Sequence, residues 1–215
     1  MTIQQKTDIW LPEVLFTGKG DLAMDRRLLR LASKGQLLKL YRGVYAANLE
    51  RTPESVVLRN WASIVGHLLP NGVLSYRSGY EVKPVDGHLY VTRGNRRRIL
   101  ALPGLSIRVI PGPGAIGTDT PFKGFFLPSQ PRWLLENLAV GRGVAGRVLS
   151  RDALEAELNK VLSIRGRHRF IELRESCCLL AELLGRGKEF KRLERIMGMM
   201  LEAHDRLRSG PLCQV

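Results

Sequence analysis

Apolar and polar positions follow a helical spacing in the segment that begins at Met24, and this segment is the most informative part of the chain. Met24, Leu28 and Leu31 follow the i, i+4, i+7 spacing of a helix whose apolar stripe faces a core. Gly35 follows at the position where a left-handed residue commonly ends a helix. Two β-prone runs then flank Arg42-Gly43, which predicts a tight turn between two strands. This segment is therefore expected to fold as a helix followed by a short hairpin.

The side of this helix opposite the apolar stripe is basic, because residues three, four and seven apart share a helix face. Asp25 is the only acid within the helix, and residues 36–48 contain none. A cationic helix followed by a cationic hairpin is typical of a winged helix-turn-helix, whose helix enters the major groove while the hairpin contacts phosphates. An ordinary solvated surface helix is the alternative. The candidate DNA-binding residues are Arg26, Arg27, Arg30, Lys34, Lys39 and Arg42.

The middle of the chain combines a buried helix with several strands. Thr52 is placed to be the N-cap of a helix that begins with a proline and continues to Leu68. The β-prone runs at 88–93 and 96–101 are separated by Gly94-Asn95, which predicts a hairpin with a tight two-residue turn. The pattern also predicts a strand at 106–110, a loop at 111–121, a short strand at 125–127 and a helix from residue 130.

The last third of the chain is predicted to be helical. Apolar stripes begin at Leu154, Phe170 and Phe190, and glycines at 166 and 185–187 separate them into three helices. A glycine-rich run at 141–146 marks the preceding domain boundary. The expected fold is α+β, with a winged helix-turn-helix domain at residues 1–50, a small mixed α/β domain at 51–146, a helical unit at 147–208 and a tail at 209–215.

Charge changes this picture, because the excess of cations is not confined to a tail. The 215 residues carry 34 Lys+Arg against 20 Asp+Glu, a formal net charge of +14. Residues 51–110 hold nine Lys+Arg and three Asp+Glu, whereas the segment from residue 151 onwards is nearly balanced. A basic surface over the first half of the chain would release counterions from a phosphate backbone, so double-stranded DNA is the expected partner.

A candidate second basic site lies at the tip of the predicted hairpin. Arg93, Arg96, Arg97 and Arg98 flank the Gly94-Asn95 turn and concentrate charge there. Two functional interpretations are open, a second phosphate contact and a binding site for an acidic partner protein. The third interpretation is a solvent-exposed turn whose charges only favour solubility.

No catalytic or metal-binding arrangement is recognisable in the sequence. Cys177 and Cys178 are adjacent and Cys213 lies near the end, which is unlike a disulfide framework or a metal quartet. The four histidines are far apart, and the glycines around Pro113 lack the Lys-Ser/Thr pair of a phosphate loop. We therefore expect no enzymatic activity, no cofactor and no metal. The chain shows neither a signal-peptide pattern nor a membrane-spanning run, so a cytoplasmic location without a membrane partner is expected.

Three segments resemble the AbiEi family, the antitoxin and transcriptional-autoregulator half of type IV toxin–antitoxin pairs. LLRLASKGQLLKLYRGVYAA resembles that family's recognition-helix and wing block, with its "G-x-L" and "R-G-V-Y" elements. NGVLSYRSGYEV resembles its "vlSh.SAl" block, although Tyr76 and Gly79 replace the usual His and Ala. DGHLYVTRGNRRRILALPGLSIRV resembles the strand pair of its second domain. The resemblance implies a bacterial repressor of its own operon, with operator DNA and a cognate toxin as partners.

The last third of the chain is similar to the helical segment that precedes the catalytic domain in some Fic-type AMP transferases. Fic activity requires a His-x-Phe-x-(Asp/Glu)-Gly-Asn-Gly-Arg loop, and none of the four histidines is followed by such a sequence. Two explanations stay open: the chain ends before a catalytic domain, or it is a stand-alone regulator with the same scaffold. The alternative function is therefore the non-catalytic regulatory or protein-binding region of a Fic-type system.

RNA binding is a minor third possibility. Recognition of single-stranded RNA uses exposed aromatic side chains on which bases stack. Tyr41 and Tyr45 are the only aromatic residues near the basic hairpin, and their spacing predicts one shared face that packs on the domain. Duplex DNA is thus favoured over RNA. The sequence leaves both a monomer and a homodimer open.

Overall fold

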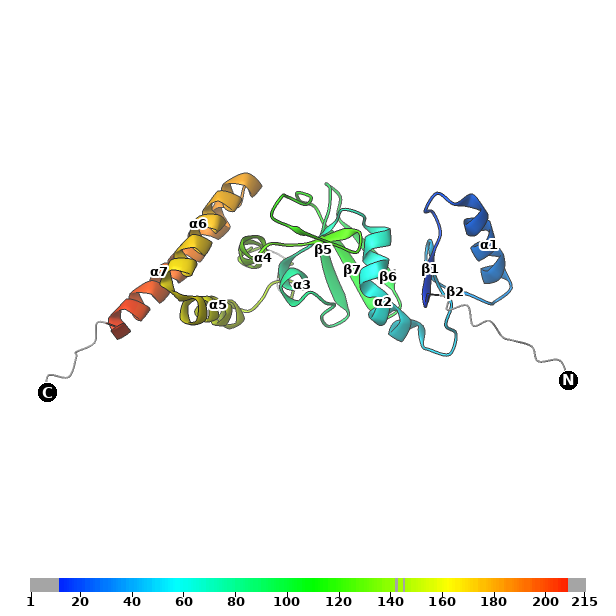
Figure 1. The fold of residues 1–215 in the computed structure, drawn as a ribbon, viewed down its shortest axis with the longest axis horizontal. Helices are drawn as coiled ribbons and strands as arrows, with labels where there is room; N and C mark the ends of the chain where they lie inside the picture. Colours follow the sequence, from blue (N-terminus) through cyan, green and yellow to red (C-terminus); the bar gives the residue numbers. More distant parts are fainter. Residues whose placement is uncertain (1–11, 142, 145, 209–215) are drawn as a thin grey trace.

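A computed structural model describes residues 12–141, 143–144 and 146–208 of the chain. The fold is mixed α+β and elongated, as Figure 1 shows. The first helix and a three-stranded sheet form one end, a six-stranded sheet lies in the middle, and a group of helices forms the other end. No helix within these residues has the length and apolar character needed to cross a membrane.

The N-terminal unit consists of one helix packed on a small antiparallel sheet with strand order β1-β3-β2. The Asp21 carboxylate caps the helix by accepting from the amides of Ala23 and Met24, each at 3.0 Å. Leu28 and Tyr45 join the helix to the sheet in a small cluster of their own. The elements are β1 (Val14–Phe16), α1 (Leu22–Ser33), β2 (Leu38–Tyr41) and β3 (Val44–Ala46).

Two expectations for the apolar side of α1 and the hairpin are wrong. Met24 is 46% exposed, because the sheet supports only the second half of α1, where Leu28 is buried. Tyr41 and Tyr45 do not share a face, since the Arg42-Gly43 turn places them in different strands and the register shifts after Lys39. Tyr45 packs under α1, whereas Tyr41 packs on the central core.

The first fifty residues were expected to form a helix-turn-helix. Within residues 12–50, α1 is the only helix, and a strand and a loop precede it. The described part of this segment is therefore a strand–helix–hairpin unit, and residues 1–11 lie outside it. The left-handed Gly35 (φ +71°) after α1 and the Arg42-Gly43 turn between β2 and β3 are confirmed.

The central unit places one long helix across a six-stranded sheet with strand order β6-β7-β5-β4-β9-β8. Thr52 caps this helix as predicted, accepting from the Ser55 amide at 3.3 Å. Gly66, inside the helix, permits close approach of the β8–β9 turn, because a Cβ there would lie 1.8 Å from the Lys123 carbonyl oxygen. The elements are α2 (Pro53–Leu68), β4 (Val73–Leu74), α3 (Tyr76–Glu81), β5 (His88–Thr92), β6 (Arg98–Leu102), β7 (Leu105–Ile110), β8 (Thr120–Phe122) and β9 (Phe125–Leu127).

The predicted hairpin around Gly94-Asn95 is wrong, because β7 lies between β5 and β6. Residues 93–97 instead cross the end of β7, where the Arg93 amide donates to the Ile110 carbonyl at 3.0 Å. The tight turn is at Pro103-Gly104, with Gly104 left-handed (φ +67°). The mostly buried β7 takes the inner position and the more exposed β6 takes the edge, which agrees with the burial each strand requires.

One hydrophobic core runs through the N-terminal sheet, α2 and the central sheet. Val14, Leu40 and Val44 from the small sheet join Val57 of α2 and Ile107 of β7 in this core, and all are buried. β2 also contacts β6. The N-terminal unit is therefore held against the central sheet by shared apolar packing that continues across residue 50.

A second core holds the helices at the other end of the molecule. The predicted separation by glycines is confirmed at Gly166 (φ +81°) and Gly185 (φ +65°). α4 was placed in the preceding domain, yet its Trp133 and Leu134 pack with these C-terminal helices. The elements are α4 (Gln130–Asn137), α5 (Arg151–Lys160), the π-helical turn η1 (Val161–Arg165), α6 (Gly166–Leu184) and α7 (Gly187–Arg208).

Candidate nucleic-acid interface

α1 lies at one end of the molecule (Figure 1), and its solvent face carries a row of exposed cations. Arg26, Arg27, Arg30 and Lys34 are all exposed, and Leu28 on the opposite side is buried. The Asp25 carboxylate is held away from them, because it accepts from the Gly18 amide at 2.9 and 3.1 Å. Among the described residues, none of these four side chains forms an ion pair. Within the described residues this face therefore presents four exposed cations that no ion pair neutralises.

The hairpin adds two cations, Lys39 in β2 and Arg42 in the turn. Lys39 is paired in register with Tyr45, whose side chain packs under α1, so Lys39 lies on the same face of the sheet as the helix. It also lines a groove of about 740 Å³ between α1 and the hairpin, together with Leu29 and Leu38. Arg42 is exposed at the turn. The sequence-predicted cations of the hairpin therefore accompany those of α1.

The hairpin turn is anchored rather than free. The Gly43 carbonyl accepts from the Thr17 amide at 3.0 Å, and a Cβ at Gly43 (φ +77°) would lie 3.4 Å from Nε2 of His67. The His67 ring packs on Phe16, with 4.6 Å between the ring centroids. Burial lowers the pKa of His67, Lys19 lowers it further, and Asp25 opposes them. A largely neutral imidazole at neutral pH thus packs on β1 beside the hairpin turn.

The candidate second basic site does not lie on a hairpin tip. Arg96, Arg97 and Arg98 are exposed on the crossover after β5 and at the start of the edge strand β6, and Arg93 is half-buried. Arg108 joins them, because β7 pairs with β6 and sets Arg108 opposite Ile99. The apolar alternation around Arg108 could have indicated its exposure, but only the strand order brings it to this site. No ion pair involves any of the five within the described part of the chain.

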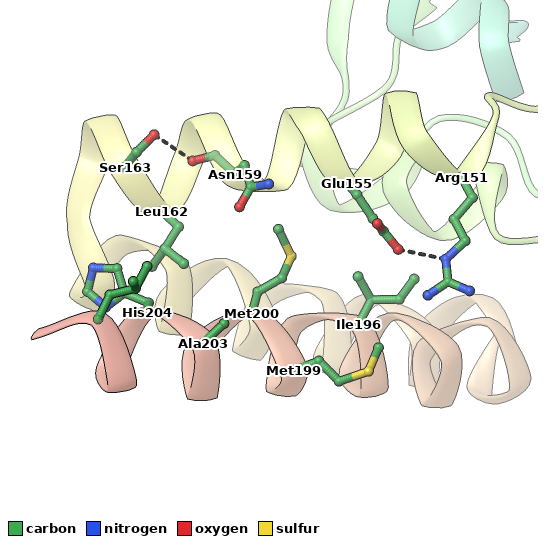
Figure 2. A pocket seen from close by; sticks show the side chains of 11 residues that line it. Arg151, Glu155, Asn159, Leu162, Ser163, Ile196, Met199, Met200, Ala203 and His204 are labelled. Carbon is green, nitrogen blue, oxygen red and sulfur yellow. Dashed lines mark hydrogen bonds and ion pairs between the residues drawn. The ribbon is translucent and has the colours of Figure 1, made fainter. Parts of the chain in front are cut away.

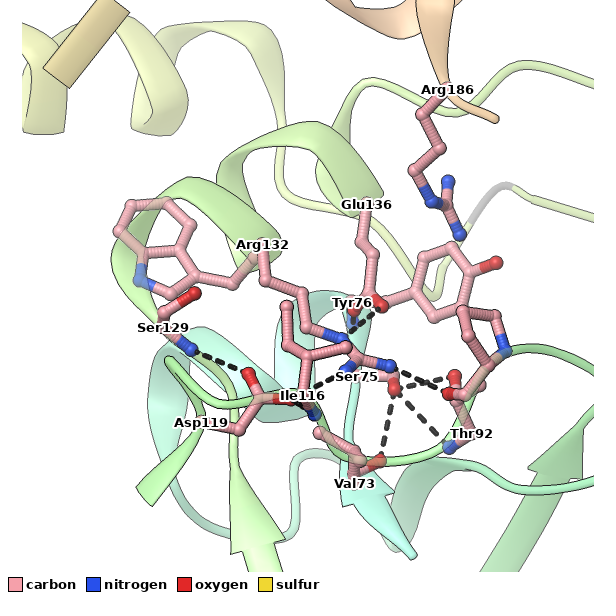
Figure 3. Close-up of polar contacts among 12 residues, drawn as sticks. Val73, Ser75, Tyr76, Thr92, Ile116, Asp119, Ser129, Arg132, Glu136 and Arg186 are labelled. Carbon is pink, nitrogen blue, oxygen red and sulfur yellow. Dashed lines mark hydrogen bonds and ion pairs between the residues drawn. The ribbon is translucent and has the colours of Figure 1, made fainter. Parts of the chain in front are cut away.

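A buried polar cluster lies between the central sheet and α4 (Figure 3). Arg132 is completely buried; its Nη1 donates to Asp119 at 2.5 Å and its Nε to Glu136 at 3.2 Å. The same guanidinium donates to the carbonyl oxygens of Pro113 and Gly114 at 2.8 and 2.9 Å. Arg132 therefore fixes the loop after β7 against α4. The i, i+4 spacing of Arg132 and Glu136 was the only sequence signal for this arrangement.

The cluster continues to α3, which begins with a left-handed Tyr76 (φ +55°). The Tyr76 amide donates to the second oxygen of Glu136 at 3.0 Å. Burial raises the pKa of Glu136, and Arg132 and Arg186 oppose the rise. Arg186, between α6 and α7, lies over the Tyr76 ring at 6.0 Å and so connects the C-terminal helices to the sheet. These contacts give the cluster a structural role.

Other chemistry is sparse in the described residues. No group of three or more His, Cys, Asp or Glu side chains there is arranged to hold a metal ion. Burial raises the pKa of Cys177 to about 12, which keeps this thiol protonated within the helical core. Comparison with known proteins found no matching family model and no curated protein with significant sequence similarity.

Proposed function

We propose that this chain is a DNA-binding transcription regulator of the AbiEi antitoxin type that represses its own toxin–antitoxin operon. In this proposal α1 enters the major groove, where Arg26, Arg27 and Arg30 approach base edges. Bidentate contacts between arginine and guanine contribute about 1–3 kcal/mol of discrimination each. The phosphate contacts would come from Lys34, Lys39 and Arg42, which position the helix without specifying sequence.

The observation that carries this proposal is the uncompensated charge on α1. Surface cations usually lie among acids, yet the one acid of this helix is bound to the Gly18 amide. The second half of the helix packs on the sheet through Leu28. A folded helix whose basic face has no ion pairs among the described residues is suited to phosphate and base contacts, because binding does not require the loss of such pairs. The antiparallel β2–β3 hairpin beside α1 supports the interpretation of this hairpin as the wing of the DNA-binding unit.

The test is binding to the DNA upstream of the gene, measured by an electrophoretic mobility assay. The Arg27→Ala, Arg30→Ala double variant should bind at least tenfold more weakly, since about 1–3 kcal/mol is lost per contact. Its melting temperature should not change, because both side chains are exposed. A matched control removes two cations at the far end, Arg167→Ala with Arg169→Ala. Equal binding by the two double variants would exclude α1 as the reading helix.

A second candidate function is the regulatory or protein-binding region of a Fic-type AMP transferase system. The observation that favours it is exposed apolar surface on the C-terminal helices, where Leu179, Leu183 and Leu207 are 70%, 69% and 86% exposed. The genomic neighbourhood separates the two candidates. An adjacent nucleotidyltransferase-like toxin gene supports the antitoxin, whereas a downstream Fic reading frame supports this second function.

A further inference from the structure

A groove runs between α5–η1 and α7 on the helical end of the molecule, with a volume of about 460 Å³ (Figure 2). One wall is mostly polar and comes from α5 and η1, with Arg151, Glu155, Asn159 and Ser163 at intervals of four residues. The other wall is mostly apolar and comes from α7, with Ile196, Met199, Met200 and Leu207, although His204 of the same helix also lines it. The groove is therefore amphipathic.

The wall formed by α7 exposes apolar side chains that do not take part in the helical core. Met199 is 48% exposed and Leu207 is 86% exposed, whereas Leu193 and Met197 on the inner side of α7 are fully buried. Such exposed apolar side chains lower the free energy when another surface covers them, by about 25 cal/mol per Å². The groove thus has an apolar stripe available for a partner.

The polar wall is held in a defined conformation. Arg151 donates to Glu155 at 2.6 Å, and the Ser163 hydroxyl donates to the Asn159 carbonyl at 2.7 Å (Figure 2). A second groove of about 280 Å³ continues from the Arg151 end and adds Arg192 and Arg195. Because Arg151 is paired with Glu155, Arg192 and Arg195 supply the excess of positive charge along the two grooves, and this excess favours a partner with carboxylates.

The length and shape of the groove fit a helix. Its walls are themselves helices, and residues 151–163 extend about 18 Å at 1.5 Å per residue. A partner helix of about three turns would match that length. Its apolar stripe would cover Met199 and Leu207 of α7, while its acidic side chains would lie at the end of the groove where Arg151 of α5 and Arg192 and Arg195 of α7 gather. A second copy of this chain is the competing occupant, and the oligomeric state in solution distinguishes it from a partner protein.

We propose that this groove binds an acidic amphipathic helix of a partner protein. The inference is independent of DNA binding, because the groove and α1 lie at opposite ends of the molecule (Figure 1).

The probe is a fluorescein-labelled peptide of about 16 residues, with leucines in one helical stripe and glutamates elsewhere. Its control has the same composition with the leucines spread around the helix. Fluorescence anisotropy with the full chain should show that the striped peptide binds at least about tenfold more tightly. Met199→Glu and Leu207→Glu should each weaken that binding about tenfold, since each removes apolar contact and adds a repelling charge.

Leu58→Glu is the matched control, because Leu58 is 44% exposed on α2 outside the groove and the charge change is the same. It should leave peptide binding unchanged, and Met199→Glu and Leu207→Glu should bind operator DNA like the parent. Equal affinity for the two peptides, or an equal loss in Leu58→Glu, would overturn the proposal in favour of simple charge attraction. A parent dimer in sedimentation velocity that Met199→Glu converts to a monomer would also overturn it and assign the groove to a second copy.

Discussion

Replacement of Arg132 by methionine tests whether the buried polar cluster stabilises the fold. Arg132 is 0% exposed and its guanidinium is the charge partner of Asp119 and Glu136, which are 6% and 1% exposed. Methionine would fill much of the volume but leave both carboxylates without their cation. Removal of one partner from a buried ion pair costs about 3–5 kcal/mol. At about 2–4 °C per kcal/mol for a protein of this size, the melting temperature should fall by roughly 6–20 °C.

The loss should also depend on pH, through Glu136. Burial already raises the pKa of this carboxyl, and removal of Arg132 takes away the largest opposing interaction. A carboxyl whose pKa is higher in the folded than in the unfolded protein binds more protons when folded. Its contribution to stability is therefore fully present below the unfolded pKa and is lost as the pH rises through the folded pKa. Arg132→Met should be less stable at pH 8 than at pH 5.5, relative to the parent.

Urea denaturation followed by circular dichroism at the two pH values measures both effects. Arg167→Met is the surface control, since Arg167 is 52% exposed and its pair with Asp205 should contribute at most about 1 kcal/mol. Addition of Glu136→Gln to Arg132→Met should recover part of the stability at pH 8, because one unpaired buried charge is removed. A loss below about 1 kcal/mol, or one independent of pH, would refute the structural role of the cluster.

Four further predictions concern DNA binding and packing. If about six cations contact phosphates, the logarithm of the DNA association constant should fall with the logarithm of the salt concentration, with a slope near −5. The Lys39→Ala, Arg42→Ala double variant should make that slope shallower by about 2 and should keep the preference for the operator over random DNA. Replacement of Arg96, Arg97 and Arg98 by alanine should reduce the slope by about 2–3, and an unchanged slope would assign this site to a protein partner. Gly66→Ala should lower the free energy of unfolding by more than about 2 kcal/mol, because its Cβ would lie 1.8 Å from the Lys123 carbonyl oxygen. Gly198→Ala, in open space on α7, should raise the free energy of unfolding by about 0.5–1 kcal/mol. Urea denaturation measures both. The pKa of His67 is lower in the folded protein, so folding favours the neutral ring. The contribution of His67 to the stability of the fold is therefore fully present above 6.5, the pKa of the unfolded protein, and is lost as the pH falls below that value. His67→Phe should flatten that part of the profile of melting temperature against pH.

Local sequence determined the helices and their ends. The Thr52 cap, the left-handed Gly35 and the apolar face of α2 depend on residues within one or two turns of each other, so spacing along the chain predicts them. The cations of α1 were identified on the same basis. Periodicity also placed their face opposite Leu28, and the structure agrees.

Tertiary structure decided every feature that depends on neighbours distant in sequence. Gly94-Asn95 and Pro103-Gly104 are both good turn sequences, and only the burial of β7 selects the second as the hairpin. The burial of Arg132 depends on two loop carbonyls and a carboxylate that precede it by at least thirteen residues. Likewise, Arg108 joins the second basic site only through the β6–β7 register. Local propensities are worth less free energy than burial of a strand or satisfaction of a buried charge, so the packed sheet overrides them.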